Sequence, residues 1–330
     1  MTLSRVAGCD TLRPVLALPP MNLLPSLQMA SPDKFSRSNR APADPGVLTS
    51  RDNRWLKSFR MALRGGLPAD QGFVGVEGPR LVEEALRSGC PIGAVLFSES
   101  GERHRTRLAP YLSQSEIAIP LLRTTDRLFE GIADTEAPQG VAALVQPRKA
   151  TFDDIVRPSP SGASPLIVVL AGVQDPGNVG TILRTAAAFG STAAVTSASG
   201  QSGTASPFSP KALRSSAGAA LHLPILAGMS LSILLAQLRV AGIRTLASTL
   251  REPHAEEQHV LAPWEVDWCE PVALLVGNEG AGLPEEVERS ADARLRIPMV
   301  TGIESLNAAA AAAVLFYEAA RQRNPLSANS

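Results

Sequence analysis

Short apolar runs in the second half of the chain alternate with segments in which apolar residues recur at helical spacing. The apolar runs have the length and the β-branched content of buried strands. Strands that alternate with helices in this way predict a parallel sheet covered by helices on both faces. The expected strands are residues 166–170, 193–196, 244–247, 272–276 and 295–297.

A smaller α/β unit is predicted ahead of these strands. Residues 50–65 place Leu56, Phe59 and Leu63 on one helical face and arginines mostly on the others, which predicts a basic amphipathic helix. The strand-like segments "GFVGVEG" and "IGAVLFS" follow, and the helical segment "PRLVEEALRSG" lies between them. The alternation continues to about Pro147.

The composition along the chain predicts four parts. Residues 1–46 are rich in proline and serine and poor in acidic residues, which predicts a disordered arm; a transit peptide and a start codon assigned too early are two other interpretations. Residues 47–148 form the small α/β domain, residues 149–164 have the composition of a linker, and residues 165–330 form the second α/β domain.

Overall composition removes several classes of function. Hydrophobic residues make up 45% and charged residues 19% of the chain, and no apolar window is long enough to span a bilayer, so we expect no membrane association. The formal net charge is zero, which neither favours nor excludes a polyanionic partner. Cys9, Cys90 and Cys269 form no disulfide or zinc pattern, so we expect a cytoplasmic protein without a metal site.

Three loops after predicted strands carry the candidate chemistry, because ligands of open α/β sheets bind at the carboxyl ends of strands. The first is "DPGNVGTILRTA", in which Asn178 is expected to cap the helix that follows and Gly180 allows another backbone to approach closely. Arg184 then interrupts an otherwise apolar helix. An arginine at such a position is solvated, paired or functional.

The second loop, "GNEGAG", follows the predicted strand at residues 272–276 and contains Glu279. The order of its glycines differs from G-x-G-x-x-G and no G-K-[ST] follows, which disfavours a dinucleotide-dependent oxidoreductase and a P-loop enzyme. A loop of this kind suits a ligand wrapped by backbone, and Glu279 either contacts that ligand or faces solvent.

The third loop, "IPMVTGIESLN", leads into a helix that begins with six alanines, residues 308–313. Alanines add little bulk, so this helix is expected to pack very closely against a neighbour. The neighbour is either another part of the same chain or a second subunit.

Together the three loops resemble the signature motifs of the SpoU/TrmH family of SPOUT-class methyltransferases. The patterns N-x-G-x-x-x-R, G-N-E-G-x-G-L and I-P-M…S-L-N occur in this order within residues 164–323. The segment "SPKALRSSAGA" also resembles the family between its first and second motifs. The preceding segments "VEGPRLVEEAL" and "TEAPQGVAALV" resemble the ribosomal-protein-L30-like (L30e-like) substrate-binding domain of members that act on ribosomal RNA.

The resemblance implies transfer of a methyl group from S-adenosylmethionine to a ribose 2'-hydroxyl of RNA, with 23S-type ribosomal RNA favoured as substrate. A transfer-RNA 2'-O-methyltransferase and a non-catalytic RNA-binding paralogue are the alternatives. The resemblance also implies a deep trefoil knot in the C-terminal SPOUT domain and a homodimer with an active site completed across its interface.

Carried over residue by residue, the resemblance implies two groups of site residues, and the basic amphipathic segment adds a third group. The catalytic group is Asn178, Arg184, Glu279, Ser305 and Asn307. The group that binds S-adenosylmethionine is Val276, Gly277, Asn278, Gly280, Gly282, Ile297, Pro298, Met299 and Leu306. Arg51, Arg54, Arg60 and Arg64 of the basic amphipathic segment are predicted to contact RNA phosphates, the alternative being a solvated helix face.

Overall fold

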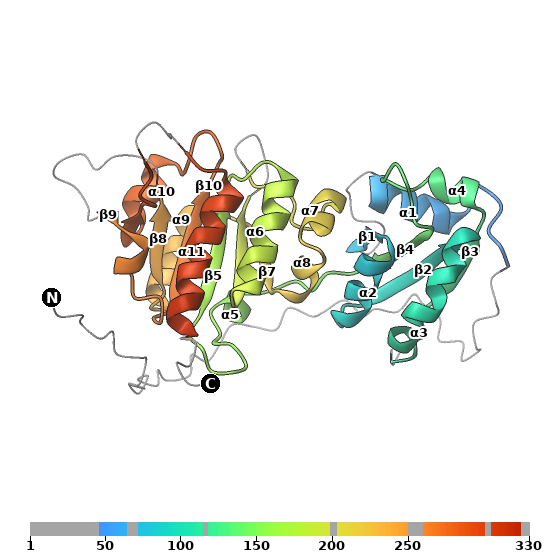
Figure 1. Cartoon of the computed structure of the whole chain (residues 1–330), viewed down its shortest axis with the longest axis horizontal. Coiled ribbons are helices and arrows are strands. Elements are labelled where there is room, and N and C mark those ends of the chain that lie inside the picture. The colour runs from blue at the N-terminus through green and yellow to red at the C-terminus, as the bar shows by residue number, and fades with distance from the viewer. Residues whose placement is uncertain are drawn as a thin grey trace, which may run out of the picture. The chain divides into compact units, whose positions relative to one another are not determined.

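The computed structural model of the chain describes residues 46–64, 72–114, 118–198, 203–249, 260–300 and 305–324. The arm predicted over residues 1–46 lies, except for its last residue, outside the described residues. Two separate sheets organise the described chain (Figure 1).

The first sheet has four strands in the order β1-β4-β2-β3. Strand β4 runs antiparallel to β1 and β2, and β2 runs parallel to β3. Helices α1 and α4 pack on one face and α2 and α3 on the other, which confirms a small α/β domain. The elements are α1 (Arg54–Arg64), β1 (Val74–Glu77), α2 (Pro79–Arg87), β2 (Ile92–Ser98), the 3-10 helix η2 (Ser100–His104), α3 (Arg105–Ser113), β3 (Leu121–Thr124), α4 (Asp126–Glu130) and β4 (Val141–Val145).

The second sheet has seven strands in the order β7-β6-β5-β10-β8-β11-β9, and every neighbouring pair is parallel. The parallel pairing confirms the predicted parallel sheet. The trefoil knot implied by the resemblance stays a prediction. The strands are β5 (Leu166–Ala171), β6 (Ala193–Ser197), β7 (Ile225–Met229), β8 (Arg244–Ser248), β9 (Val260–Leu261), β10 (Val272–Gly277) and β11 (Ala293–Leu295).

Helices cover both faces of this sheet because its central strands are buried on both sides. Val168 and Leu170 of β5 pack in the core shared with α6 and α11, while Ile167 and Val169 pack with α5 and α9. Figure 1 shows α6 and α11 side by side across one face. The remaining elements are α5 (Phe152–Ile155), α6 (Pro176–Ala188), α7 (Pro210–Ser215), α8 (Ala219–His222), α9 (Leu231–Val240), η3 (Pro263–Glu265), α10 (Glu285–Ser290) and α11 (Ala308–Arg323).

The strand expected at residues 295–297 is shifted, since β11 ends at Leu295. Its last partner on β8 is Ser248, the final residue of β8. Helix α5 lies inside the segment predicted as a linker. A capping box between Thr151 and Asp154 begins this short helix, which buries Ile155 in the core on one face of the second sheet.

The alanine-rich start of α11 packs within the chain. Ala308, Ala309 and Ala312 are buried in the core that also contains residues of α6. The opposite face of α11 is exposed at Val314 and Tyr317, so one helix face serves the core and the other is open.

Gly180 is the point of closest approach between α6 and α7, as its expected role requires. A Cβ atom there would lie 2.7 Å from Ser215 Cβ and 2.9 Å from the Ser216 backbone nitrogen, and closer still to the Ala212 carbonyl oxygen.

Gly180→Ala is therefore expected to lower the free energy of unfolding by about 1–3 kcal/mol, despite alanine's better helix propensity. Urea denaturation measures this loss, with the exposed Thr181→Ala as control; equal stability of Gly180→Ala and wild type would contradict the packing described.

Candidate active site

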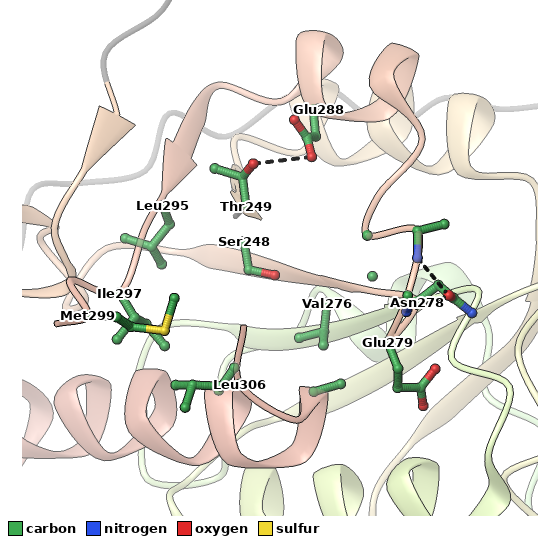
Figure 2. Close-up of a pocket in the computed structure, with 16 residues that line it drawn as sticks. Ser248, Thr249, Val276, Asn278, Glu279, Glu288, Leu295, Ile297, Met299 and Leu306 are labelled. Carbon is green, nitrogen blue, oxygen red and sulfur yellow. Dashed lines mark hydrogen bonds between the residues drawn. The ribbon is translucent and has the colours of Figure 1, made fainter. Parts of the chain in front are cut away.

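A pocket of roughly 240 Å³ lies where β8 and β10 end. Ser248 and Thr249 line it from the end of β8, and the loop after β10 forms a second wall. The third wall comes from the segment after β11 and from Leu306, just before α11 (Figure 2). The pocket therefore lies at the carboxyl ends of parallel strands, where ligands of open α/β sheets bind.

The Asn278 side chain shapes the loop after β10. Its Oδ1 atom accepts hydrogen bonds from the backbone N–H groups of Gly280 at 2.9 Å and Ala281 at 3.0 Å. Its Nδ2 atom donates to the Gly172 carbonyl oxygen at 2.9 Å, which ties this loop to the one after β5. Asn278 thus holds the loop with its side chain.

Gly277 and Gly282 bring the two ends of that loop together. Asn278, the residue after Gly277, exchanges two backbone hydrogen bonds of 3.0 Å with Gly282. Gly282 has a φ of +71°, a conformation that favours glycine. A Cβ atom on Gly277 would lie 2.5 Å from the backbone of Gly282 and Leu283. A side chain at position 277 would force the loop open, so the tight turn requires glycine there.

Three polar side chains from three loops meet beside the pocket. Asn178 Nδ2 donates to Glu279 Oε1 at 2.7 Å, and Asn307 Nδ2 donates to Asn178 Oδ1 at 3.2 Å. Asn307 also begins α11, because its Oδ1 accepts from the backbone N–H groups of Ala309 and Ala310. The structure thus joins three of the five residues predicted to be catalytic.

The expectation that Asn178 caps α6 is wrong. Asp175 is the N-cap, its carboxylate accepts from the Asn178 backbone N–H at 3.3 Å, and Pro176 takes the first helical position. Asn178 therefore lies in the first turn, and its side chain is available for Glu279.

The Asp175 carboxylate is held in its charged form. The Lys211 ammonium, 2.6 Å from Asp175 Oδ1, and the backbone N–H of Gly177 lower the pKa of this carboxyl. Because the folded-state pKa is lowered, its contribution to stability is complete above the carboxyl's ordinary range and is lost as the pH falls through the lowered pKa. The first turn of α6 is thus anchored at neutral pH.

Arg184 and Ser305, the other two residues predicted to be catalytic, lie on the exposed surface. Arg184 is exposed on α6 and makes no ion pair or hydrogen bond within the described part of the chain. Ser305 is exposed next to Leu306, which lines the pocket. The structure brings neither into contact with the Asn178–Glu279–Asn307 junction.

Eight of the nine residues predicted to bind the cofactor line the pocket, and Pro298 does not. Ser248 and Thr249 were missed, although they directly follow the strand predicted at residues 244–247 and the strand-end rule would have found them. Glu288 was also missed, because it lies within a helix and no motif marks it. The remaining lining residues outside the prediction are Ala281, Leu295, Ala308 and Ala311.

The pocket suits a ligand with a flat ring and a positive charge. Leu295, Ile297 and Leu306 give it an apolar end (Figure 2). Glu279 and Glu288 are its only charged lining residues among those the structure describes. S-adenosylmethionine, which joins an adenine nucleoside to a sulfonium, has both features.

The arginines predicted to contact RNA differ in their surroundings. Arg54 is exposed, and its guanidinium lies 5.5 Å from the centre of the Trp55 ring. Arg60 is half-buried on the same helix, and Arg51 lies with Arg127 at a shallow depression. These three remain available for a ligand.

Arg64 has a structural role. Its Nε atom donates to the Ala133 carbonyl oxygen at 2.7 Å, and its Nη2 atom donates to the Glu130 carbonyl oxygen at 3.1 Å. Arg64 thus satisfies carbonyl groups at the end of α4 and ties α1 to it.

The described ranges contain neither a helix able to cross a membrane nor a cluster able to hold a metal ion. No helix within them has the length and apolar character needed to cross a membrane. No group of three or more His, Cys, Asp and Glu side chains within them is arranged to hold a metal ion.

Comparison with known proteins identifies the family. Residues 165–317 match the SpoU rRNA Methylase family, and residues 69–143 match the MRM3-like substrate binding domain. An uncharacterized tRNA/rRNA methyltransferase of Synechocystis is 34% identical over 85% of this chain and 96% of its own length. The 23S rRNA (guanosine(2553)-2'-O)-methyltransferase RlmP of Bacillus subtilis is 32% identical over 73% of this chain and 86% of its own length.

A solved structure supports the same family assignment. The S-adenosylmethionine-bound rRNA methyltransferase of Sinorhizobium meliloti has a TM-score of 0.68 and 29% identity, covering 83% of this chain and 97% of that one. The chain therefore belongs to the SpoU rRNA methylase family. It is an RNA methyltransferase that uses S-adenosylmethionine.

Proposed function

We propose that this enzyme methylates a ribose 2'-hydroxyl of 23S-type ribosomal RNA. The observation that carries the proposal is the junction of Asn178, Glu279 and Asn307 at the edge of the cofactor pocket. The similarity to RlmP supports the 2'-hydroxyl and 23S ribosomal RNA as targets. The match of residues 69–143 to a substrate-binding domain agrees with the L30e-like domain that the sequence resemblance implies, and that resemblance favours ribosomal over transfer RNA.

The chemistry is a displacement at carbon. S-adenosylmethionine supplies a methyl group activated by its sulfonium. The 2'-oxygen forms a bond to the methyl carbon as the carbon–sulfur bond breaks, and the hydroxyl proton leaves. The protein must therefore align the two reactants in line and stabilise the charge that develops on the oxygen.

Glu279 is the residue that faces the positive end of the cofactor in this proposal. Its carboxylate lines the pocket, and the hydrogen bond from Asn178 fixes its orientation. Asn307 in turn fixes Asn178, since it donates to the Asn178 side-chain oxygen. The carboxylate is thus held in place before the cofactor binds, which removes a cost of ordering it during the reaction.

Arg184 is the group proposed to hold the RNA. A guanidinium has five N–H donors and no acceptor, so it suits the ribose oxygen and a neighbouring phosphate rather than the role of a base. In this account Arg184 stabilises the developing alkoxide, and the proton passes to water or to a phosphate oxygen. Its exposure on α6, without an ionic partner among the described residues, keeps it available for RNA.

Replacement of this guanidinium tests the proposal directly. Arg184→Ala is expected to lower methyl transfer to 23S ribosomal RNA by about 100-fold or more, because a charge-stabilising donor is lost. The measurement follows labelled methyl incorporation from S-adenosylmethionine, and binding of S-adenosylhomocysteine should be unchanged. Arg157→Ala, an exposed arginine outside the second sheet, is the control; a normal rate for Arg184→Ala would contradict the role.

We also propose that Arg51, Arg54 and Arg60 contact RNA phosphates. Replacing all three by glutamine is expected to weaken RNA binding and to flatten its salt dependence by roughly 0.7–0.9 per lost contact in log–log slope. Filter binding at several salt concentrations measures this. Lys57→Gln, on the same helix but paired with Asp52 at 3.0 Å, is the control; an unchanged slope in the triple variant would reject the contact surface.

A homodimer is proposed through the open face of α11. Val314 and Tyr317 are 43% and 59% exposed there, and the Tyr317 ring meets that of Phe189, the residue after α6, edge-on with 6.0 Å between ring centres. An apolar surface spanning two neighbouring helices suits a second copy, and this face adjoins the helix that carries Arg184.

A buried charge should break such an interface. Val314→Glu is expected to convert a dimer into a monomer in light scattering coupled to size-exclusion chromatography, because an unpaired carboxylate is costly to bury. The control is Val240→Glu on α9, where the native side chain is 91% exposed. A monomeric wild-type protein at micromolar concentration, or a dimeric Val314→Glu protein, would count against the interface.

We propose a cytoplasmic location, because the relatives named above come from bacteria, in which ribosomal RNA is assembled in the cytoplasm. This location rests on the proposed substrate. A transfer-RNA substrate remains the second candidate, since the relative in Synechocystis is described as a tRNA/rRNA methyltransferase.

A further inference from the structure

Two buried hydroxyl groups lie beside the loop that follows β5. Ser197, the last residue of β6, is 7% exposed, and Thr204, between β6 and α7, is 3% exposed. Their side-chain oxygens are 2.9 Å apart. Both accept a hydrogen bond from the Gly172 backbone N–H, Thr204 at 2.9 Å and Ser197 at 3.2 Å. Thr204 is not among the residues that line the cofactor pocket.

The direction of these hydrogen bonds follows from the protons available. Thr204 has one hydroxyl proton, and its Oγ1 atom donates that proton to the Leu170 carbonyl oxygen at 2.7 Å. Because the proton is used there, Ser197 must be the donor in the contact between the two hydroxyls. Thr204 Oγ1 therefore donates once and accepts twice, which makes it the centre of this hydroxyl cluster.

The backbone of Gly172 links the hydroxyl cluster to the loop that follows β10. Gly172 comes directly after β5 and has a φ of +83°, which favours glycine. Its N–H group donates to the two hydroxyls, and its carbonyl oxygen accepts from Asn278 Nδ2 at 2.9 Å. The oxygen of the same Asn278 side chain accepts from two backbone N–H groups of the loop after β10. A continuous series of hydrogen bonds thus runs from Thr204 to that loop.

Residues 204 and 205 hold the backbone on both sides of the Gly172 carbonyl. Thr204 accepts the Gly172 N–H, and the Ala205 N–H donates to the Val173 carbonyl oxygen at 2.9 Å. The Gly172 carbonyl lies between these two contacts along the chain. Because glycine has wide backbone freedom, contacts on both sides restrict the direction of its carbonyl group. Asn278 therefore meets an acceptor whose position is set by a segment outside the pocket.

We propose that Thr204 is a positioning residue for cofactor binding, which acts through Gly172 and Asn278 on the loop that follows β10. Residues 278–282 of that loop line the pocket, so their arrangement decides how well the cofactor fits. A loop held in one shape before the cofactor arrives loses less freedom on binding. The inference rests on the proposed function, because it takes the pocket to hold the cofactor.

Removal of the Thr204 hydroxyl tests the proposal through calorimetric binding of S-adenosylhomocysteine. Thr204→Val nearly keeps the size of the side chain but loses its hydrogen bonds, and it should bind this ligand roughly 3- to 10-fold more weakly, the range of one ordinary hydrogen bond. Thr204→Ser restores the hydroxyl and should bind like wild type. Thr124→Val removes a buried threonine hydroxyl from β3 of the small domain and should also bind like wild type.

A double-mutant cycle separates positioning from a general loss of stability. Asn278→Asp keeps an acceptor for the loop and removes the donor to Gly172, so Thr204→Val in this background should weaken binding by less than about 2-fold further. Urea denaturation shows whether each variant is folded. If Thr204→Val is not, Ser197→Ala replaces it, because it removes one donor and one acceptor of the same cluster. Ser197→Ala should cause a smaller loss of affinity that likewise disappears in the Asn278→Asp background.

Two results would overturn the inference. One is a folded Thr204→Val protein whose affinity for S-adenosylhomocysteine is within about 2-fold of that of wild type. The other is the same loss of affinity with and without Asn278→Asp, which would mean that Thr204 acts only through the fold. Failure of the wild-type protein to bind S-adenosylhomocysteine at all would instead reject the proposed function.

Discussion

The parallel pairing of β5 with β10 is the constraint on which the site depends. The two strands are in register to their ends, where Ala171 is opposite Gly277, so the loops that follow them leave the sheet at the same level. The Asn278 side chain bonds one loop to the other, and Asn178 then reaches Glu279. Residues about a hundred positions apart in sequence become neighbours through strand pairing, because parallel strands present their carboxyl ends on one edge.

Glycine and alanine allow the loop after β10 and the helices near it to pack closely around the carboxyl ends of the strands. Gly277 lets the loop after β10 close on its own base, and Gly180 lets α7 approach α6. Buried alanines at the start of α11 let that helix lie against the same core as α6. The polar groups proposed to be catalytic are therefore held by close backbone packing, and we expect a side chain at either glycine to displace them.

The sequence predicted the parts of the structure that have a strong local signal. Apolar runs located the central strands, and helical spacing located α1, because burial on both sheet faces or on one helix face leaves a clear pattern. The edge strands β7 and β9 were missed, since only one of the five residues of β7 is buried and β9 has two residues. Motifs brought Asn178, Glu279 and Asn307 forward as candidates, and their hydrogen bonding became visible only in three dimensions. Glu288 has no local signal as a pocket-lining residue, because only the fold brings α10 to the pocket.

Methyl transfer to a ribose 2'-hydroxyl of 23S ribosomal RNA is the reaction that we propose for this enzyme. It is tested most directly by mapping 2'-O-methylated positions in total RNA, at single-nucleotide resolution, from cells with and without the gene. The account predicts the loss of a single 23S position and its return when the wild-type gene is restored. An unchanged map would contradict the claim, and a loss confined to transfer RNA would leave the chemistry in place while rejecting the substrate.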